Sequence, residues 1–325
     1  MSVLTEVGTE SAVLKPFPAP REWDPYPERR TVLVAGATGR QGGAVVRHLL
    51  KAGWIPRGLT RDPSSPAAQD LAFRGVELVQ GDMMDLSSLM AAMDGAHGVF
   101  SVQESRRIGF HQEIRQGMNL ADAAARSGVG HFVYASMASA DRWPNIDRME
   151  AKYTVENHLR WIGLARTILR PALFLEDHIG PDPMRWVRVR RFVNPLPADR
   201  RIQVSSVDDL ARFAVAAFLD PGRFLGRRVA FAGDEVTNAG IAGALSLASG
   251  RKVHFRRSPG ILTSFGARKG LAQVYRKLAT SGFGLNIEAI KRENQAVGMS
   301  SLTDWLRARI NPVPGPNSVR KPSDP

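Results

Sequence analysis

The stretch TVLVAGATGRQGG, residues 31–43, decides the fold of this chain. Residues 31–36 form a short β-branched and apolar run that ends in glycine, which is typical of a strand buried on both faces of a sheet. Residues 44–51 then carry apolar side chains at helical spacing, and Gly53 is a natural C-terminal cap. A strand followed by a helix is the first half of a βαβ unit.

Gly36, Gly39 and Gly42 stand at GxxGxxG spacing at the turn between this strand and this helix. A pyrophosphate needs an approach free of Cβ atoms, and a helix N-terminus offers it unpaired amides and a partial positive charge. The motif therefore predicts that a dinucleotide binds at residues 36–42. The other expected cofactor contacts in this loop are Thr38, Arg40 and Gln41.

The same alternation continues along the chain. Further strands are expected at about 55–60, 76–80, 98–102, 131–136 and 165–170, with helices between them, the last of these over about 151–161. Strands that alternate with helices predict a parallel sheet covered on both faces, with right-handed crossovers. The predicted fold class is α/β, a Rossmann-type doubly wound parallel sheet with a smaller mixed C-terminal part that covers the substrate.

The pattern divides the chain into four segments. Residues 1–29 are rich in Pro, Glu and small polar residues and are expected to form a flexible arm. Residues 30–170 are expected to form the cofactor-binding domain, with a helix at 207–219 packing back on it. Residues 171–312, including a strand at 227–233, are expected to form the smaller C-terminal part, and 313–325 a disordered tail.

Composition narrows the function. The chain of 325 residues has 44 basic and 31 acidic side chains, a net charge of +13, but its arginine pairs are scattered and match no nucleic-acid motif, so nucleic acid is not an expected partner. No apolar run reaches the roughly 18 residues that a membrane helix needs. The start of the chain lacks the character of a signal or transit peptide, so a cytoplasmic protein is expected. No feature of the sequence indicates an oligomeric state.

The absence of cysteine excludes disulfides, thiol nucleophiles and cysteine-ligated metals. His111, His131 and His158 lack a second histidine or carboxylate at ligand spacing, so no metal site is predicted. Any redox chemistry must be carried by a bound cofactor.

The end of the second strand indicates which cofactor. An NAD-specific protein usually places an acidic residue there for the ribose 2′-hydroxyl, whereas this strand ends in Thr60 and Arg61. Arg61 can pair with a 2′-phosphate, and Arg40 adds to the same attraction. Asp62 is the opposing signal, because a shift of one residue would bring its carboxylate toward the ribose. The sequence favours NADP(H) over NAD(H).

Further cofactor contacts are expected where later strands end. Asp82 and Met83 follow the third strand, and Val102 and Gln103 follow the fourth. The carboxyl ends of parallel strands meet at one edge of the sheet, where ligands of open α/β folds bind. For each of these residues alone, a capping or packing role is an equal alternative.

These motifs together resemble the NmrA-like family of atypical short-chain dehydrogenases/reductases. The resemblance covers about residues 30–260 and is carried by GATGRQGG, TRDPSSPAA, FVYAS, TILRPALFLED, SSVDDLARFAVAAFLDP and RRVAFAGDEVT. It implies an NADP-preferring domain with a small substrate-covering part, in a family of quinone and dye reductases and of cofactor-sensing regulators. It also implies that Arg170, Pro171, Phe174 and Asp177 lie beside the nicotinamide, where Phe174 packs on the ring or substrate, or simply fills the junction.

Short-chain dehydrogenases use a Ser, a Tyr and a Lys, the last two being four residues apart on one helix. Ser136 and Lys152 are the candidate catalytic residues, and Lys152 looks like the ribose-binding lysine, with a solvated surface lysine as the alternative. The position four residues before Lys152 is Arg148. Tyr153 cannot substitute, since adjacent helical side chains point about 100° apart.

The missing tyrosine disfavours reduction of simple ketones, whose alkoxide product needs a nearby acid. The leading prediction is an oxidoreductase that passes hydride from NADPH to a quinone-like or other conjugated small acceptor in the cleft between the two parts. The alternative is a non-catalytic NADP(H)-sensing regulator that acts by binding another protein. The arginine-rich residues 185–201 favour an anionic ligand, a protein partner or merely a solvated surface.

Overall fold

The computed structural model describes residues 31–103, 109–258 and 269–310. The expectations of a flexible arm at 1–29 and of a disordered tail at 313–325 concern residues that lie outside these ranges.

The centre of the fold is a seven-stranded sheet with the strand order β10-β6-β5-β4-β1-β2-β3. All neighbouring strands in it pair in parallel. The strands are β1 (Thr31–Val34), β2 (Ile55–Thr60), β3 (Glu77–Gln80), β4 (Gly98–Ser101), β5 (His131–Ala135), β6 (Arg166–Pro171) and β10 (Arg228–Phe231). The chain order reverses between β1 and β4, which is the place where open parallel sheets bind ligands. The α/β fold class with a parallel sheet is confirmed.

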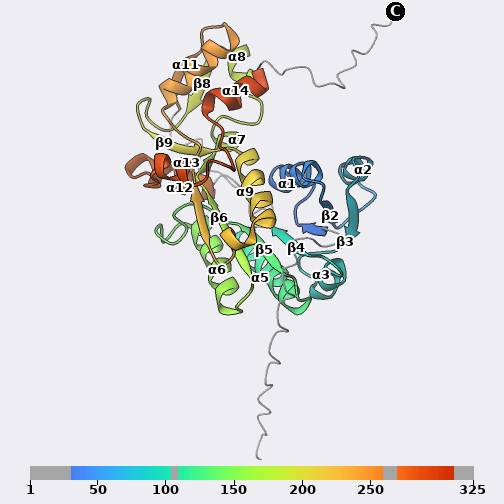
Figure 1. Cartoon of the computed structure of the whole chain (residues 1–325). Coiled ribbons are helices and arrows are strands. Elements are labelled where there is room, and N and C mark those ends of the chain that lie inside the picture. Colours follow the sequence, from blue (N-terminus) through green and yellow to red (C-terminus); the bar gives the residue numbers. More distant parts are fainter. Residues whose placement is uncertain (1–30, 104–108, 259–268, 311–325) are drawn as a thin grey trace, which may run out of the picture.

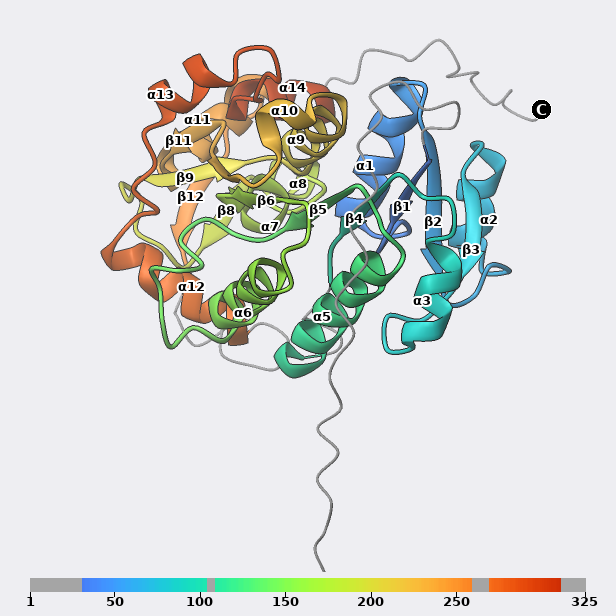
Figure 2. The ribbon, with the colours of Figure 1, turned by 60° about the horizontal axis from the view of Figure 1, so that its bottom comes forward.

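Helices cover both faces of this sheet (Figure 2). One face is covered by α1 (Arg40–Lys51), α2 (Pro66–Phe73), α9 (Val207–Leu219) and α10 (Pro221–Phe224). The other face is covered by α3 (Leu86–Ala92), α5 (Phe110–Arg126) and α6 (Asp147–Trp161). Apolar side chains of these helices and of the strands form one cluster on each face, so the sheet is buried on both sides.

Helix α6 begins at Asp147, four residues earlier than expected. Asp147 and Glu150 lie in its first turn, where carboxylates interact favourably with the positive end of the helix dipole. The earlier start matters for the site, because it places Arg148 and Lys152 one turn apart on the same helix.

One strand lies in a different place from the one expected. The sequence pattern places residues 228–231 in the smaller C-terminal part, but they form β10, which pairs in parallel with β6 at the edge of the main sheet. The cause is α9, which packs on α1 and returns the chain to the sheet. The expected division at residue 170 is therefore wrong for β10, since the chain enters the C-terminal part, returns to the sheet and leaves it again.

The C-terminal part lies at the top and left of Figure 1 and comprises two small sheets and six helices among the described residues. One sheet has the order β11-β9-β7, and the other pairs β12 with β8. Its elements are β7 (Leu173–Phe174), α7 (Leu175–His178), α8 (Met184–Arg188), β8 (Arg191–Asn194), β9 (Ile202–Ser205), β11 (Asp234–Val236), α11 (Asn238–Ser249), β12 (His254–Arg257), α12 (Lys269–Thr280), α13 (Ile287–Glu293) and α14 (Leu302–Ile310).

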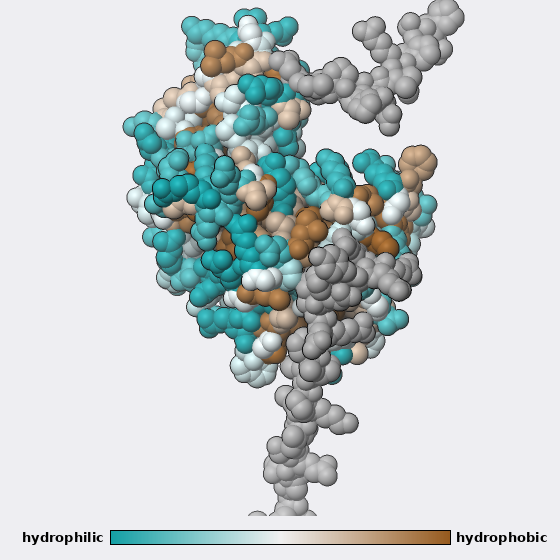
Figure 3. All heavy atoms as spheres, in the orientation of Figure 1, coloured by the Kyte–Doolittle hydropathy of each residue, from teal (hydrophilic) through white to brown (hydrophobic). Residues whose placement is uncertain are grey.

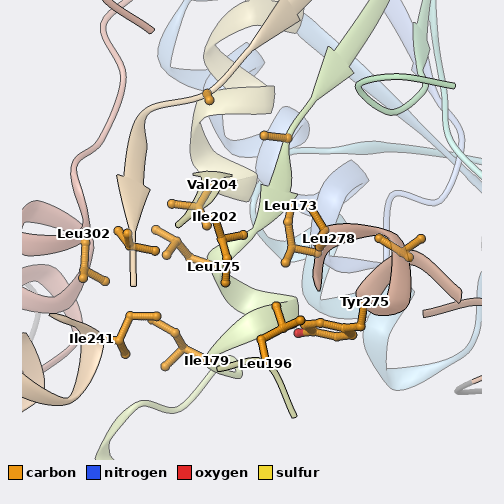
Figure 4. Packing of buried hydrophobic residues seen from close by; sticks show 14 of the residues in the cluster. Leu173, Leu175, Ile179, Leu196, Ile202, Val204, Ile241, Tyr275, Leu278 and Leu302 are labelled. Atoms are coloured by element: carbon orange, nitrogen blue, oxygen red, sulfur yellow. The ribbon is translucent and has the colours of Figure 1, made fainter. Parts of the chain in front are cut away.

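This part has an apolar core of its own. Figure 4 shows Leu173, Ile202 and Val204 from the three-stranded sheet converging with Leu278 and Leu302 from helices late in the chain. Leu173 also lines the cleft described below, so the packing of this core fixes one wall of the site.

Hydrophilic residues cover most of the face seen in Figure 3, although smaller apolar groups interrupt them. No helix within the described ranges has both the length and the apolar character needed to cross a membrane.

The close packing of β4 under α9 predicts a stability effect at Gly98. A Cβ atom at Gly98 would lie 2.6 Å from the buried Phe218 ring, so Gly98→Ala should lower the free energy of unfolding by about 1–3 kcal/mol. Gly243→Ala on α11, where no atom lies within 4 Å of the new Cβ, should instead raise it by about 0.4–1 kcal/mol. Urea unfolding of both variants measures the difference, and equal effects would contradict the packing described.

Candidate functional site

A cleft lies at the carboxyl edge of the main sheet, between the ends of β1, β4, β5 and β6 and the segment β7–α7. It encloses about 1060 Å³, including space open to solvent. The sequence-predicted residues that line it are Gly36, Gly39, Arg40, Gln41, Gly42, Met83, Val102, Gln103, Ser136, Lys152, Pro171 and Phe174. The structure thus brings together residues that follow β1, β3, β4 and β5 and residues at the end of β6.

The glycine loop packs so closely that it excludes side chains. Gly36 has φ of +65°, in the left-handed region. A Cβ atom at Gly42 would lie 2.2 Å from the carbonyl oxygen of Gly36, so only glycine allows α1 to approach the end of β1 this closely. Helix α1 begins after Gly39, which gives no side-chain cap, and its first turn carries no acidic residue. The first amides of α1 therefore remain available to an anion.

Three predicted cofactor residues do not line the cleft: Thr38, Arg61 and Asp82. Thr38 and Arg61 are exposed. Asp82 shapes the turn after β3, because its carboxylate accepts a hydrogen bond of 2.9 Å from the backbone N–H of Met84. Asp82 therefore has the capping role that the sequence offered as the alternative to cofactor binding.

The carboxylate of Asp62 points into its own turn. It accepts hydrogen bonds from the Ser64 backbone N–H at 2.9 Å and from the Ser64 hydroxyl at 2.6 Å. These bonds lower the pKa of Asp62 below its ordinary value. Both bonds go to Oδ1, which is therefore occupied locally, and the adjacent Arg61 side chain is exposed just after β2.

Arg40 joins the glycine loop to the C-terminal part. Its guanidinium lies 2.8 Å from a carboxylate oxygen of Asp177 and donates to the backbone carbonyl of Glu176 at 3.3 Å. The sequence predicted a phosphate contact for Arg40. In this structure its partner is instead a residue on the opposite wall of the cleft, and Asp177 lines that wall.

The neighbouring Glu176 carboxylate is buried and connects three distant segments. It accepts hydrogen bonds from the Val207 backbone N–H at 3.1 Å, the Trp305 indole at 2.8 Å and the Arg309 guanidinium at 3.1 Å. Burial raises the pKa of Glu176, although these donors oppose the rise. Through Glu176 and Asp177, Arg40 is linked to the start of α9 and to α14.

Lys152 lies in the cleft as part of a buried ion pair. Its Nζ is 2.8 Å from Oε1 of Glu113, whose side chain is only 1% exposed. Glu113 stands on the buried face of α5 with Gly117 and Leu120. Sequence reasoning missed this partner, although a glutamate at the spacing of the buried residues was a signal for it. The prediction that Lys152 enters the cleft agrees with the geometry, and the surface alternative does not.

Ser136 belongs to a second buried charge cluster. Its hydroxyl donates to Oε1 of Glu156 at 2.5 Å, and Arg170 holds both oxygens of the same carboxylate, at 2.9 and 2.5 Å. Arg170 also lies 2.9 Å from Asp141. The Ser136 proton is therefore committed to Glu156, and Ser136 faces a ligand as an acceptor rather than as a donor. Glu156, four residues after Lys152, was also missed.

Among the residues that the structure describes, no tyrosine hydroxyl takes the place of the missing tyrosine. Tyr153 packs against the core of the C-terminal part. Tyr134 lies below the cleft with its ring 5.3 Å from Lys152 Nζ, but it is fully buried. Burial, with the charges of Glu113 and Glu156, raises the pKa of Tyr134 well above its ordinary value. Arg148 does line the cleft.

The histidines take part in local contacts. His131 lies 2.8 Å from the Thr167 hydroxyl, and His158 lies 2.6 Å from Asp122. Within the described ranges, no group of three or more His, Asp or Glu side chains is arranged to hold a metal ion.

A family model connects this site to known proteins. The NmrA-like family matches residues 28–284, most of the chain. The chain belongs to the NmrA-like family. The resemblance seen in the sequence motifs is therefore confirmed.

The proteins that are similar to this chain differ in what their names say they do. An NmrA-like family domain-containing oxidoreductase of Aspergillus hancockii is 32% identical over 250 residues, 70% of this chain and 75% of the relative. The NADPH-dependent quinone oxidoreductase of Escherichia coli, solved with NADPH, has a TM-score of 0.70 at 23% identity, over 85% of this chain and 98% of that one. NmrA, a negative transcriptional regulator solved with NADP, has a TM-score of 0.72 at 22% identity, over 88% and 96%.

The buried pair of Lys152 and Glu113 predicts a non-additive stability effect. Lys152→Met leaves the Glu113 charge buried without its partner and should cost about 3–5 kcal/mol of unfolding free energy. The double variant Lys152→Met/Glu113→Gln, which removes both charges, should recover most of that loss. A double-mutant cycle by urea unfolding gives the coupling, and additive losses would show that the two groups do not interact.

Proposed function

We propose that this protein is an NADPH-dependent oxidoreductase that reduces a quinone-like or other conjugated small acceptor in the cleft. The observation that carries the proposal is the position of Lys152, which shares one cleft with the glycine loop while no tyrosine hydroxyl reaches that cleft among the described residues. Membership of a family that contains named oxidoreductases supports it.

The residues fit a dinucleotide. The glycine loop is a cradle that a Cβ atom would fill, and it lies at the uncapped start of α1, which suits a pyrophosphate. Lys152 Nζ pairs with Glu113 at 2.8 Å and carries three N–H donors, which can serve ribose hydroxyls. Gln103 Oε1 is buried without a hydrogen-bond partner in the described chain and is available to a donor. Pro171 and Phe174 line the same cleft.

The cleft is suited to acceptors that need little help with a proton. When bound, NADPH supplies the hydride. Reduction of a simple ketone produces a strongly basic alkoxide, and an acid beside it would have to supply the proton. The Ser136 hydroxyl donates its hydrogen bond to Glu156, and the phenol of Tyr134 is buried below the cleft. A quinone yields a weakly basic product and a cationic dye a neutral one, so both can accept hydride here.

We also propose NADP(H) as the preferred cofactor. Arg61 stands exposed at the end of β2, where an adenosine ribose lies in folds of this kind. The carboxylate of Asp62, which would favour a 2′-hydroxyl, is bonded to Ser64. Arg61 therefore offers a guanidinium to a 2′-phosphate, while the carboxylate of Asp62 is turned toward Ser64.

A second candidate function is an NADP(H)-sensing regulator that acts through another protein. The linkage from Arg40 through Asp177 and Glu176 to α14 favours it, because a ligand that moves Arg40 also affects the C-terminal part. Lys152 does not discriminate between the two candidates, since ribose binding serves both.

NADPH oxidation tests the leading proposal. The purified protein should oxidise NADPH with at least one member of a panel of quinones and cationic triphenylmethane dyes, followed by the loss of absorbance of the reduced nicotinamide. Simple ketones should give no turnover. Tight NADPH binding without oxidation by any acceptor would reject the enzyme and favour the regulator.

Cofactor preference is tested at Arg61. Arg61→Ala removes a charge-assisted contact with the 2′-phosphate and should weaken NADPH binding by about 1–3 kcal/mol. NADH binding should change little, because NADH lacks that phosphate. Titration of both cofactors into the wild type and the variant measures this, and Arg74→Ala, an exposed arginine that pairs with Asp70, is the matched control. Equal losses for NADPH and NADH would rule out the assigned contact.

A further inference from the structure

Arg148 stands where the charge balance of the cleft is incomplete. It lies in the first turn of α6, one turn before Lys152, and its side chain lines the same cleft. Four helical residues correspond to a rise of about 6 Å, so Arg148 extends the surface of α6 just beyond Lys152. Arg148 therefore lies next to Lys152, the residue that faces the ribose in the proposed function.

The other basic side chains that line the cleft are already neutralised within the described chain. Lys152 pairs with Glu113 at 2.8 Å, and Arg40 pairs with Asp177 at 2.8 Å. Below the cleft, Arg170 is held by Glu156. The two walls therefore contribute ion pairs rather than net charge.

Arg148 differs from these residues. Its guanidinium forms no ion pair with any described residue, and its Nε is buried without a hydrogen-bond partner there. A buried N–H donor left unpaired costs roughly 1–3 kcal/mol, which a ligand atom that accepts its hydrogen bond would recover. The described lining of the cleft thus carries one uncompensated positive charge, beside the place where an acceptor must lie.

We propose that Arg148 stabilises the negative charge that develops on the acceptor oxygen during hydride transfer. This inference rests on the proposed oxidoreductase function and deepens it. A quinone that accepts a hydride gains its electron pair and becomes a hydroquinone monoanion, while the nicotinamide is oxidised. The second proton then comes from water. Arg148 does not supply that proton, because a guanidinium stays protonated in proteins, but its N–H groups bind the anionic oxygen.

The same charge makes the site selective. A cationic dye becomes neutral when it accepts a hydride, so it presents no anion for Arg148 to stabilise. Before the transfer its own positive charge is repelled by the guanidinium. Arg148 therefore promotes the reduction of oxygen acceptors and opposes the reduction of cationic ones.

Kinetics with two acceptors tests this role. With 2-methyl-1,4-naphthoquinone, Arg148→Gln should lower kcat about 100-fold, the scale of a lost oxyanion donor, with a smaller change in KM. With a cationic triphenylmethane dye, the same variant should keep or raise kcat/KM. Arg148→Lys retains the charge and should recover part of the quinone activity. Equal losses with both acceptors would overturn the assignment and indicate a structural or cofactor-binding role.

A binding experiment tests the charge without turnover. 2-Hydroxy-1,4-naphthoquinone is an anion at neutral pH, and 2-methyl-1,4-naphthoquinone is a neutral analogue. In calorimetric titration of the NADP⁺-loaded protein, Arg148→Gln should weaken binding of the anion at least tenfold. Binding of the neutral analogue should weaken less than twofold. Arg160→Gln, an exposed arginine on the same helix, removes the same charge and should change neither. Equal effects on both compounds would reject the proposal.

The two proposals fail in different ways. If no acceptor oxidises NADPH, the oxidoreductase function is wrong, and the binding titration still decides whether Arg148 recognises an anionic oxygen. If turnover occurs but Arg148→Gln affects quinone and dye alike, the function stands and the role of Arg148 is wrong. Thermal melting of the variants confirms that both comparisons use folded protein.

Discussion

The structure depends on the contact between Gly42 and the carbonyl of Gly36. Because neither glycine carries a Cβ atom, the first turn of α1 packs against the loop that follows β1, and its first amides face the carboxyl edge of the sheet. The position of α1 also determines that of α9, which packs on it, and α9 in turn carries the chain back to β10. A side chain at Gly42 would therefore disturb the phosphate cradle and the edge of the sheet together.

Buried charges organise the rest of the cleft. Glu156 holds Ser136 and Arg170, while Glu113 holds Lys152, so two carboxylates from α6 and α5 set the orientation of the polar groups at the ends of β5 and β6. Such pairs cost desolvation and often add little net stability. What they provide is a fixed geometry, since each side chain has a partner that prevents it from turning away from the cleft.

Local signals made much of this predictable. The glycine spacing, the strand ends and the place of Lys152 depend on neighbours within one βαβ unit, and the structure puts most of the residues expected there in one cleft. Glu113, Glu156 and Asp177 were missed as partners because their contacts join different elements, and the helical or strand pattern of one element does not show them; Asp177, for instance, is 137 residues from Arg40. The sheet expected for β10 was wrong for a similar reason, since the apolar pattern of a strand does not indicate which sheet it joins. The preference for NADP(H) stays a prediction from Arg61.

The link between Arg40 and Asp177 means that part of the attraction for a phosphate is already in use before any ligand arrives. A ligand that recruits this guanidinium must compete with a carboxylate from the opposite wall, which lowers its affinity and makes that affinity sensitive to salt. When a ligand displaces Asp177 from Arg40, Asp177 is released. Its neighbour Glu176 holds α9 and α14 by hydrogen bonds. The occupied and free forms would then differ in the mobility of α9 and α14. Proteolysis and hydrogen exchange would therefore give different profiles for the two forms.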